Sequence, residues 1–223
     1  MRPGTLLRLR ALKKIFTREI FRDSVVLDIG SYDGVVSDQL QKLAAGLDIT
    51  VVDVDESGLQ LAREKGLKTL RASVLELPIP DNSVDVVLGL DLIEHVADDN
   101  KAVGELGRVL KTGGKLILTT PKQDGVSFPF MSREKIAEIN SQWGHVRPGY
   151  SLQQLEDLLH SHNLAIEKSM GYFNFLTRFA YWLAYLSELR IPGRYVLYRL
   201  VTRLEPYIKY RPMEHIIIGT KIS

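Results

Sequence analysis

Acidic residues and glycines follow a β-branched run near the start of the chain. The run Val25-Val26-Leu27-Asp28-Ile29 leads into Gly30, Ser31, Tyr32, Asp33 and Gly34. Glycines at such a position let the backbone turn tightly and approach a ligand closely. A dinucleotide fingerprint needs three glycines in the spacing G-x-G-x-x-G, whereas the spacing here is G-x-x-x-G. Two nearby carboxylates repel phosphate, so this segment favours a cationic ligand without phosphate groups.

A second pair of carboxylates ends the next apolar run, Val51-Val52-Asp53-Val54-Asp55. A carboxylate at the end of a buried strand can accept hydrogen bonds from both hydroxyls of a ribose. Asp55 directly precedes a helical pattern and is suited to cap that helix. We therefore expect Asp53 to bind a ribose and Asp55 to be a helix cap.

Alternating strand and helix patterns position these residues. Apolar β-branched runs predict strands at 25–29, 49–54, 67–72, 84–88, 115–120, 164–170 and 215–222. Helical spacing of apolar residues predicts helices at 34–45, 56–65, 98–110 and 151–162, whereas 123–150 reads as irregular. Continuous apolar strands separated by helices indicate a parallel sheet covered on both faces. Such sheets bind ligands at the carboxyl ends of their strands.

Composition excludes several kinds of site. The 223 residues include no cysteine, which rules out a disulfide scaffold, a thiolate metal site and a cysteine nucleophile. The five histidines are scattered without ligand spacing beside carboxylates, so we expect no metal site. The longest uncharged aromatic-rich run, 179–187, is nine residues long, which is too short to span a bilayer.

Charge divides the chain into three parts. Residues 1–22 carry a net charge of +6, residues 23–165 carry −9, and residues 166–223 carry +5. The first part has leucines at helical spacing and predicts a basic amphipathic helix. The last part gathers 11 of the 18 aromatic residues, with arginines between them. The middle and the two ends are therefore expected to do different work.

The middle of the chain resembles a known family in four consecutive motifs. These are VVLDIGSYDG, VVDVDES, LELPIPDNSVDVVLGLDLIEHV and ELGRVLKTGGKLILTTP, followed by a weaker match in GHVRPGYSLQQLEDLL. In order and spacing they resemble class I S-adenosylmethionine-dependent methyltransferases, especially the type 11 small-molecule group. The resemblance implies an α/β fold: a Rossmann-like, seven-stranded, mainly parallel sheet with helices on both faces and an antiparallel last strand. A helical cap insertion is expected beside it.

The resemblance also implies a cofactor, S-adenosyl-L-methionine, and assigns residues to it. Asp28, Gly30, Ser31 and Gly34 would line its methionine end, and Leu90 and Asp91 would lie beside the sulfonium. Asp53 would bind the ribose and Val54 would pack on the adenine. Tyr32 stands where the family usually has a glycine. Ser73, followed by Val74, stands where an acidic residue often accepts the adenine amino group.

Candidate catalytic residues lie in two places. Asp91 could attract the cofactor or remove a proton from a substrate hydroxyl, and Glu94-His95 matches a family pair that we expect to support the fold. His145 lies in the irregular segment, where a lid is expected, and is the best candidate for a general base. Arg147 and Tyr150 are predicted to bind the substrate, with the arginine able to hold a carboxylate or phosphate.

The expected organisation is a basic N-terminal helix (1–22) and a methyltransferase domain (23–223). That domain comprises a cofactor-binding core (23–122), a lid and acceptor segment (123–150) and an aromatic–basic helical insertion (172–212). Three interpretations of this insertion stay open: a plain helical cap, an acceptor site for an amphiphile at an anionic membrane, and nucleic-acid binding.

The predicted function is direct in-line methyl transfer to a hydroxyl or similar group on a small or lipid-linked metabolite. The expected location is cytoplasmic, with peripheral contact to an anionic membrane as an option and nucleic acid disfavoured as a partner. The alternatives are an RNA methyltransferase and a catalytically inactive binding module with a methyltransferase fold.

Overall fold

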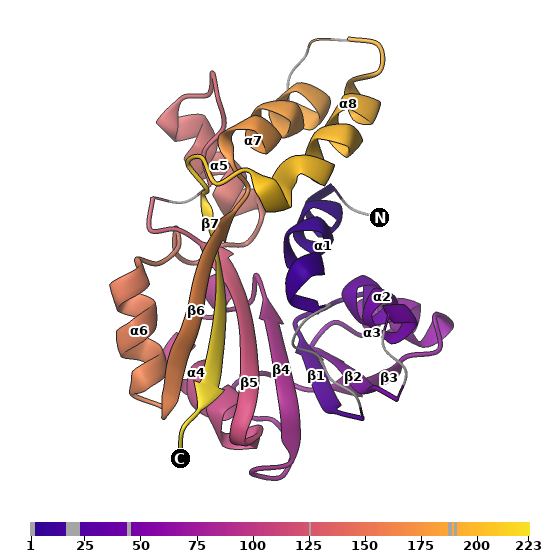
Figure 1. Ribbon diagram of the computed structural model, residues 1–223, viewed down its shortest axis with the longest axis vertical. Coiled ribbons are helices and arrows are strands. Elements are labelled where there is room, and N and C mark those ends of the chain that lie inside the picture. The colour runs from indigo at the N-terminus through magenta and orange to yellow at the C-terminus, as the bar shows by residue number, and fades with distance from the viewer. Residues whose placement is uncertain (1–2, 17–22, 44–45, 125, 187–188, 190) are drawn as a thin grey trace.

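A single twisted sheet of seven strands organises the chain (Figure 1). The computed structural model describes residues 3–16, 23–43, 46–124, 126–186, 189 and 191–223. The order across the sheet is β3-β2-β1-β4-β5-β7-β6. The strands are β1 (Val25–Ile29), β2 (Asp48–Asp53), β3 (Lys68–Arg71), β4 (Val84–Leu90), β5 (Leu110–Pro121), β6 (Leu164–Tyr172) and β7 (Glu214–Lys221).

The direction of the strands confirms the predicted fold class. β1 pairs in parallel with β2 and β4, β2 pairs in parallel with β3, and β4 with β5. β7 is antiparallel to both of its neighbours, β5 and β6. The strand order reverses between β1 and β4, which is where open α/β sheets bind their ligands.

Two apolar cores cover the two faces of the sheet. Successive residues of a strand point to opposite faces, so Val26 packs with α1 and α2 while Leu27 packs with α4 and α6. The helices of the α/β unit are α2 (Val35–Leu43), α3 (Glu56–Glu64), α4 (Asp99–Val109) and α6 (Leu152–His160). A capping box at Ser151 and Gln154 starts α6 within one residue of the predicted position.

The N-terminal helix α1 (Pro3–Phe16) is part of the core rather than a solvated arm. Leu7, Leu12, Ile15 and Phe16 are buried against one face of the sheet. At the first residue of α1, the Pro3 carbonyl oxygen accepts a hydrogen bond from the Tyr198 hydroxyl at 2.8 Å. Residues 17–22 of the predicted helix lie outside the described residues, and the division of the chain into domains stays a prediction.

The segment between β5 and α6 differs from the irregular structure expected for 123–150. It contains a helix, α5 (Arg133–Gln142), which begins after Ser132, whose hydroxyl caps it. Only Ile139 of this helix is buried, so the sequence there lacks the apolar periodicity that marks a packed helix. An exposed helix with a polar sequence is therefore missed by pattern alone.

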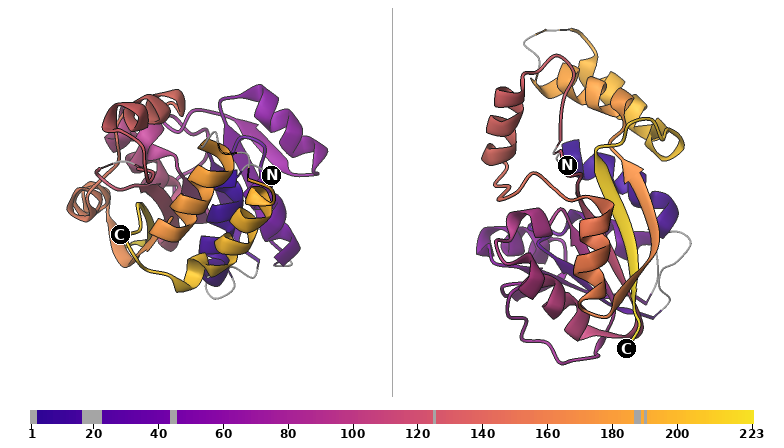
Figure 2. Two further views of the ribbon diagram at one scale, coloured as in Figure 1. Left: turned by 90° about the horizontal axis from the view of Figure 1, so that it is seen from above. Right: turned by 90° about the vertical axis from the view of Figure 1, so that its left-hand side faces the viewer.

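The aromatic–basic segment forms the predicted helical cap. It consists of α7 (Phe175–Tyr181), the π-helical turn η2 (Trp182–Leu186), α8 (Arg194–Val201) and the 3₁₀ turn η3 (Thr202–Tyr207). α8 begins directly after Gly193, which has a φ of 75°. Figure 2 shows α5, α7 and α8 beyond the carboxyl ends of the parallel strands, and Figure 1 shows α1 between α8 and the sheet. None of the helices in the described part of the chain is both long and apolar enough to cross a membrane.

Candidate active site

A cavity of about 510 Å³ lies at the carboxyl edge of the sheet, beneath α1. The ends of β1, β4, β5 and β6 contribute Asp28, Leu90, Pro121 and Tyr172 to its wall. β7 runs antiparallel, so its first residue, Glu214, lies at the same edge. A search confined to the loops after strands misses Glu214, because only the tertiary fold reveals which end of β7 faces the cavity.

The cavity wall is strongly acidic. The described residues that line it include one arginine, Arg8, and five residues with carboxyl groups: Asp28, Asp33, Asp91, Glu94 and Glu214. Burial and the charge of Asp91 raise the pKa of Glu94 to about 8, and the same causes hold the pKa of Glu214 well above its usual range. Carboxylates crowded in this way favour a ligand that brings positive charge.

Arg8 reaches from α1 to the end of β4 and forms an ion pair with Asp91. The two side chains are 18% and 24% exposed, so the pair is largely shielded from water. The hydroxyls of Thr119 and Tyr172 donate further hydrogen bonds to the other carboxylate oxygen of Asp91. The sequence pattern placed Arg8 on a basic helix but offered no signal that it enters the site.

The glycine-rich turn after β1 holds Asp28 inside the protein. The hydroxyls of Ser31 and Ser37 donate to its carboxylate at 2.7 and 2.6 Å. Burial raises the pKa of Asp28, and this effect is larger than the lowering by the two hydrogen bonds. Gly30 has a φ of 72°, and a Cβ there would lie 2.8 Å from the Leu92 side chain. Only glycine fits this turn without displacing its neighbours.

Tyr32 takes the left-handed conformation that glycine would adopt more easily, with a φ of 53°. Its ring packs over the first turn of α3, where a Cβ on Gly58 would lie 2.5 Å from it. Its hydroxyl lies 3.3 Å from the Ser57 hydroxyl. The missing side chain of Gly58 therefore makes room for the tyrosine that replaces the usual glycine of the turn.

Asp53 is engaged by backbone N–H groups at the end of β2. The Tyr32 and Asp55 amides donate to its two oxygens at 2.8 and 2.9 Å. Each carboxylate oxygen has a second lone pair, so the side chain can still accept ribose hydroxyls. Asp55 caps α3 through the Ser57 amide, which confirms its predicted role as a helix cap.

The remaining residues predicted for the adenine side have different surroundings. Val54 is 60% exposed, Val74 is buried in the core, and the Ser73 hydroxyl accepts the Leu75 amide at 3.1 Å. These residues, together with Asp53 and Gly34, do not line the 510 Å³ cavity. Their roles toward the cofactor stay predictions.

Arg147 and Tyr150 lie outside this cavity and border a separate hollow. The Arg147 guanidinium forms an ion pair with Asp99 and donates to the Val96 and Ala97 carbonyls, both at 2.8 Å. The Tyr150 hydroxyl donates to the same Asp99 carboxylate at 2.7 Å. These contacts fasten the loop after α5 to the start of α4, and substrate binding by the two residues stays a prediction.

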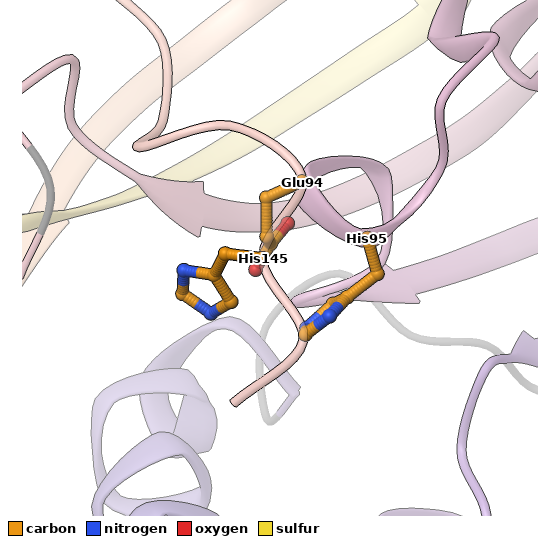
Figure 3. A group of neighbouring side chains, drawn as sticks. All are labelled: Glu94, His95 and His145. Carbon is orange, nitrogen blue, oxygen red and sulfur yellow. The ribbon is translucent and has the colours of Figure 1, made fainter. Parts of the chain in front are cut away.

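Glu94, His95 and His145 come together beside the cavity (Figure 3). Their potential ligand atoms all lie within 4.8 Å of one another. Burial, followed by the charge of neighbouring His95, lowers the pKa of His145 to about 4, so its imidazole is neutral at neutral pH. Spacing along the chain could not reveal this group, because His145 reaches the Glu94-His95 pair only through the fold.

Removing the charge of Arg8 tests the electrostatics of the cavity. We expect Arg8→Met to lower the free energy of unfolding at pH 7 by about 3 kcal/mol, because it leaves the largely buried Asp91 carboxylate without its cation. As the pH rises through the pKa of Glu94, about 8, a second carboxylate near Arg8 ionises, so the deficit should grow with pH and shrink as the pH falls toward neutrality. Urea denaturation at several pH values measures both effects.

The matched control is Lys42→Met, which removes the exposed ion pair with Asp38. It should change stability by less than about 1 kcal/mol. Equal, pH-independent effects of the two variants would contradict a buried role for Arg8.

Comparison with known proteins shows what the middle of the chain is similar to. Residues 27–118 match the model of a methyltransferase domain. A probable S-adenosylmethionine-dependent methyltransferase of Mycobacterium tuberculosis is 34% identical over 51% of this chain and 44% of its own length. A ubiquinone biosynthesis O-methyltransferase of Bordetella avium is 30% identical over 47% of this chain and 46% of its own. A ubiquinone/menaquinone biosynthesis C-methyltransferase of Rickettsia bellii is 37% identical over 48% of this chain and 49% of its own length. The chain thus spans about half the length of these relatives.

Solved structures share the fold at low sequence identity. A geranyl diphosphate C-methyltransferase of Streptomyces coelicolor A3(2) superposes with a TM-score of 0.69, at 12% identity, over 96% of this chain and 78% of that one. The [4+2]-cyclase SpnF superposes with a TM-score of 0.66, at 20% identity, over 96% of this chain and 81% of that one. A cyclase among these neighbours shows that the fold alone does not decide the chemistry. The family model and the sequence relatives together show that residues 27–118 form a methyltransferase domain, and its motifs and strand order are similar to those of class I S-adenosylmethionine-dependent methyltransferases.

Proposed function

We propose that this protein transfers the methyl group of S-adenosyl-L-methionine to a hydroxyl or similar group on a small or lipid-linked metabolite. The observation that carries the proposal is the acidic cavity at the point where the strand order reverses, with five carboxylates against one arginine. The cofactor has a sulfonium and an ammonium cation and no phosphate. An acid-rich site without a phosphate-binding turn suits that ligand better than a dinucleotide.

The residues of β1 and β2 supply a plausible seat for the cofactor. Asp28, Gly30 and Ser31 line the cavity and would face its methionine end. Asp53 has lone pairs left for the ribose hydroxyls, and exposed Val54 offers an apolar surface to the adenine. Asp91 would attract the sulfonium, in competition with Arg8.

The reaction requires alignment more than chemical activation. The acceptor oxygen attacks the methyl carbon, the carbon–sulfur bond breaks, and its electron pair stays on sulfur as the sulfonium loses its charge. The hydroxyl proton passes to a base, for which neutral His145 and Asp91 are the candidates in the cavity wall. The chain has no cysteine to carry the methyl group, so transfer is direct.

Calorimetry with S-adenosylmethionine and S-adenosylhomocysteine tests the cofactor seat. Asp53→Ala should weaken both ligands by about 10- to 100-fold, because it removes charged acceptors of the ribose hydroxyls. Asp55→Ala, which removes the exposed cap of α3, is the control and should leave affinity unchanged. Failure of the unaltered protein to bind either ligand at millimolar concentration would favour the inactive binding module instead.

Turnover tests the candidate base. Once a labelled-methyl screen of extracts has identified an acceptor, His145→Ala should lower kcat by about 10²- to 10⁴-fold with little change in cofactor affinity. His160→Ala, on the exposed side of α6, is the matched control. Unchanged turnover of the His145 variant would remove this residue from the mechanism.

The outer face of the helical cap supports a lipid-linked acceptor. Val196, Leu200 and Leu204 recur every four residues and are 61%, 50% and 49% exposed. Arg199 and Arg203 border a shallow hollow on the same surface. An exposed apolar stripe beside arginines is the pattern of a helix that lies in the surface of an anionic membrane.

Much of the aromatic segment, by contrast, packs internally. Tyr198 is fully buried and contacts the rings of Tyr181 and Tyr185 edge-on. The Tyr198 ring is therefore not free to stack on a nucleic-acid base. The exposed aliphatic residues Val196, Leu200 and Leu204 favour a membrane over RNA as the partner of this surface.

Sedimentation with vesicles that contain phosphatidylglycerol tests the membrane contact. The protein should bind them at low salt and dissociate as salt screens its arginines. The double variant Val196→Glu, Leu200→Glu should lose binding, whereas Leu43→Glu, Leu61→Glu, at exposed leucines of α2 and α3, should retain it. Equal binding by both variants, or no binding by the unaltered protein, would contradict the membrane contact and favour an acceptor that is soluble in water.

A further inference from the structure

We propose that Glu94, His95 and His145 form a binding site for one divalent transition-metal cation in the wall of the cavity. Glu94 and His95 come from the short turn η1 (Ile93–His95), which follows β4, and His145 comes from the loop after α5. All three side chains line the cavity, and Figure 3 shows them as neighbours, with the His145 ring turned away from the other two.

The distances suit a cation after a small closure. The potential ligand atoms lie within 4.8 Å of one another. Ligands at about 2.1 Å from a tetrahedral zinc ion are about 3.4 Å apart, so the ligand atoms need to approach one another by up to about 1.4 Å. Two of them are on adjacent residues and the third is on a loop, so rotation of side chains achieves this without moving the sheet.

Unpaired buried atoms provide a second, independent indication of a ligand. Glu94 is completely buried, and its Oε1 has no hydrogen-bond partner among the described residues. The Nδ1 atom of His145 is likewise buried without a partner. Polar atoms left unpaired in this way cost about 1–3 kcal/mol each. A bound cation would satisfy Oε1 of Glu94, and it would satisfy Nδ1 of His145 once that ring turns toward the site.

Neighbouring hydrogen bonds already orient the proposed ligands. Nδ1 of His95 faces the Gly144 carbonyl oxygen at 3.1 Å, and since that oxygen can only accept, Nδ1 must carry the proton. The lone pair of the neutral ring is then on Nε2, free for a metal. The Thr120 hydroxyl donates to Oε2 of Glu94 at 3.1 Å, and the Val146 amide donates to the Glu94 carbonyl oxygen at 2.9 Å. Metal ligands in proteins are commonly held by such outer contacts.

The donor set indicates which cations would bind. Two imidazoles and one carboxylate suit zinc, iron or cobalt better than magnesium or calcium, which prefer oxygen ligands. The nearby carboxylate of Asp91 adds negative charge, although Arg8 is bound to it. Three protein ligands leave one coordination position open toward the cavity. If the proposed function holds, that position would receive the acceptor's oxygen, which would point to hydroxyl or keto acceptors.

Cobalt(II) and zinc titrations of the metal-free protein, without an affinity tag, test the site directly. We expect one equivalent of cobalt to give the visible absorption of a site with nitrogen and oxygen ligands, and zinc to displace it. Glu94→Gln, His95→Ala and His145→Ala should each weaken zinc by more than about 100-fold, beyond the loss typical of an outer contact. His160→Ala is the matched control and should bind as the unaltered protein does.

Circular dichroism and calorimetry with S-adenosylmethionine accompany each titration. A variant that is folded and binds the cofactor but not zinc supports the site, since misfolding is then excluded. No stoichiometric binding by the unaltered protein, or equal binding by all variants, overturns it. Zinc binding without any cofactor binding would leave the metal site standing and refute the proposed function, whereas the reverse would refute the metal site alone.

Discussion

The crowding of carboxylates at one edge of the sheet is the constraint on which the arrangement of this protein depends. Asp28, Asp91, Glu94 and Glu214 are held there by three strands, β1, β4 and β7, or the turns that follow them, in surroundings that largely exclude water. Like charges at short range in a low dielectric destabilise the folded state unless a cation joins them or protons neutralise them. The raised pKa of Glu94 and of Glu214 expresses that cost.

α1 provides a cation that pairs with one of these carboxylates. Its apolar side packs on the sheet through Leu12 and Phe16, and the same helix delivers Arg8 to Asp91. A single basic helix thus contributes both to the core and to the charge balance of the cavity. Because α1 also contacts Tyr198 of the cap, the roof of the cavity and the proposed membrane face belong to one packed unit.

The remaining negative charge is what makes the cavity suited to ligands. A cationic cofactor would offset Asp28 and Asp91, and a divalent cation would bind Glu94 and the two imidazoles beside it. The cofactor and the cation would engage different carboxylates, so these two ligands are compatible; with His145 bound to the cation, Asp91 is the remaining candidate base. Both proposals follow from the same physical fact, that five carboxylates share the wall with one arginine.

Local sequence determined the strands, their alternation with helices and the glycine turn after β1. β-branched runs, helix caps such as Asp55 and glycines such as Gly30 act over a few residues, so patterns of a few residues reveal them. The tertiary structure alone decided which distant side chains meet: Arg8 with Asp91, His145 with Glu94, Tyr32 with Gly58, and Glu214 with the cavity. Pairing across 20 to more than 80 residues depends on how helices and the antiparallel strand pack, and no local period encodes it.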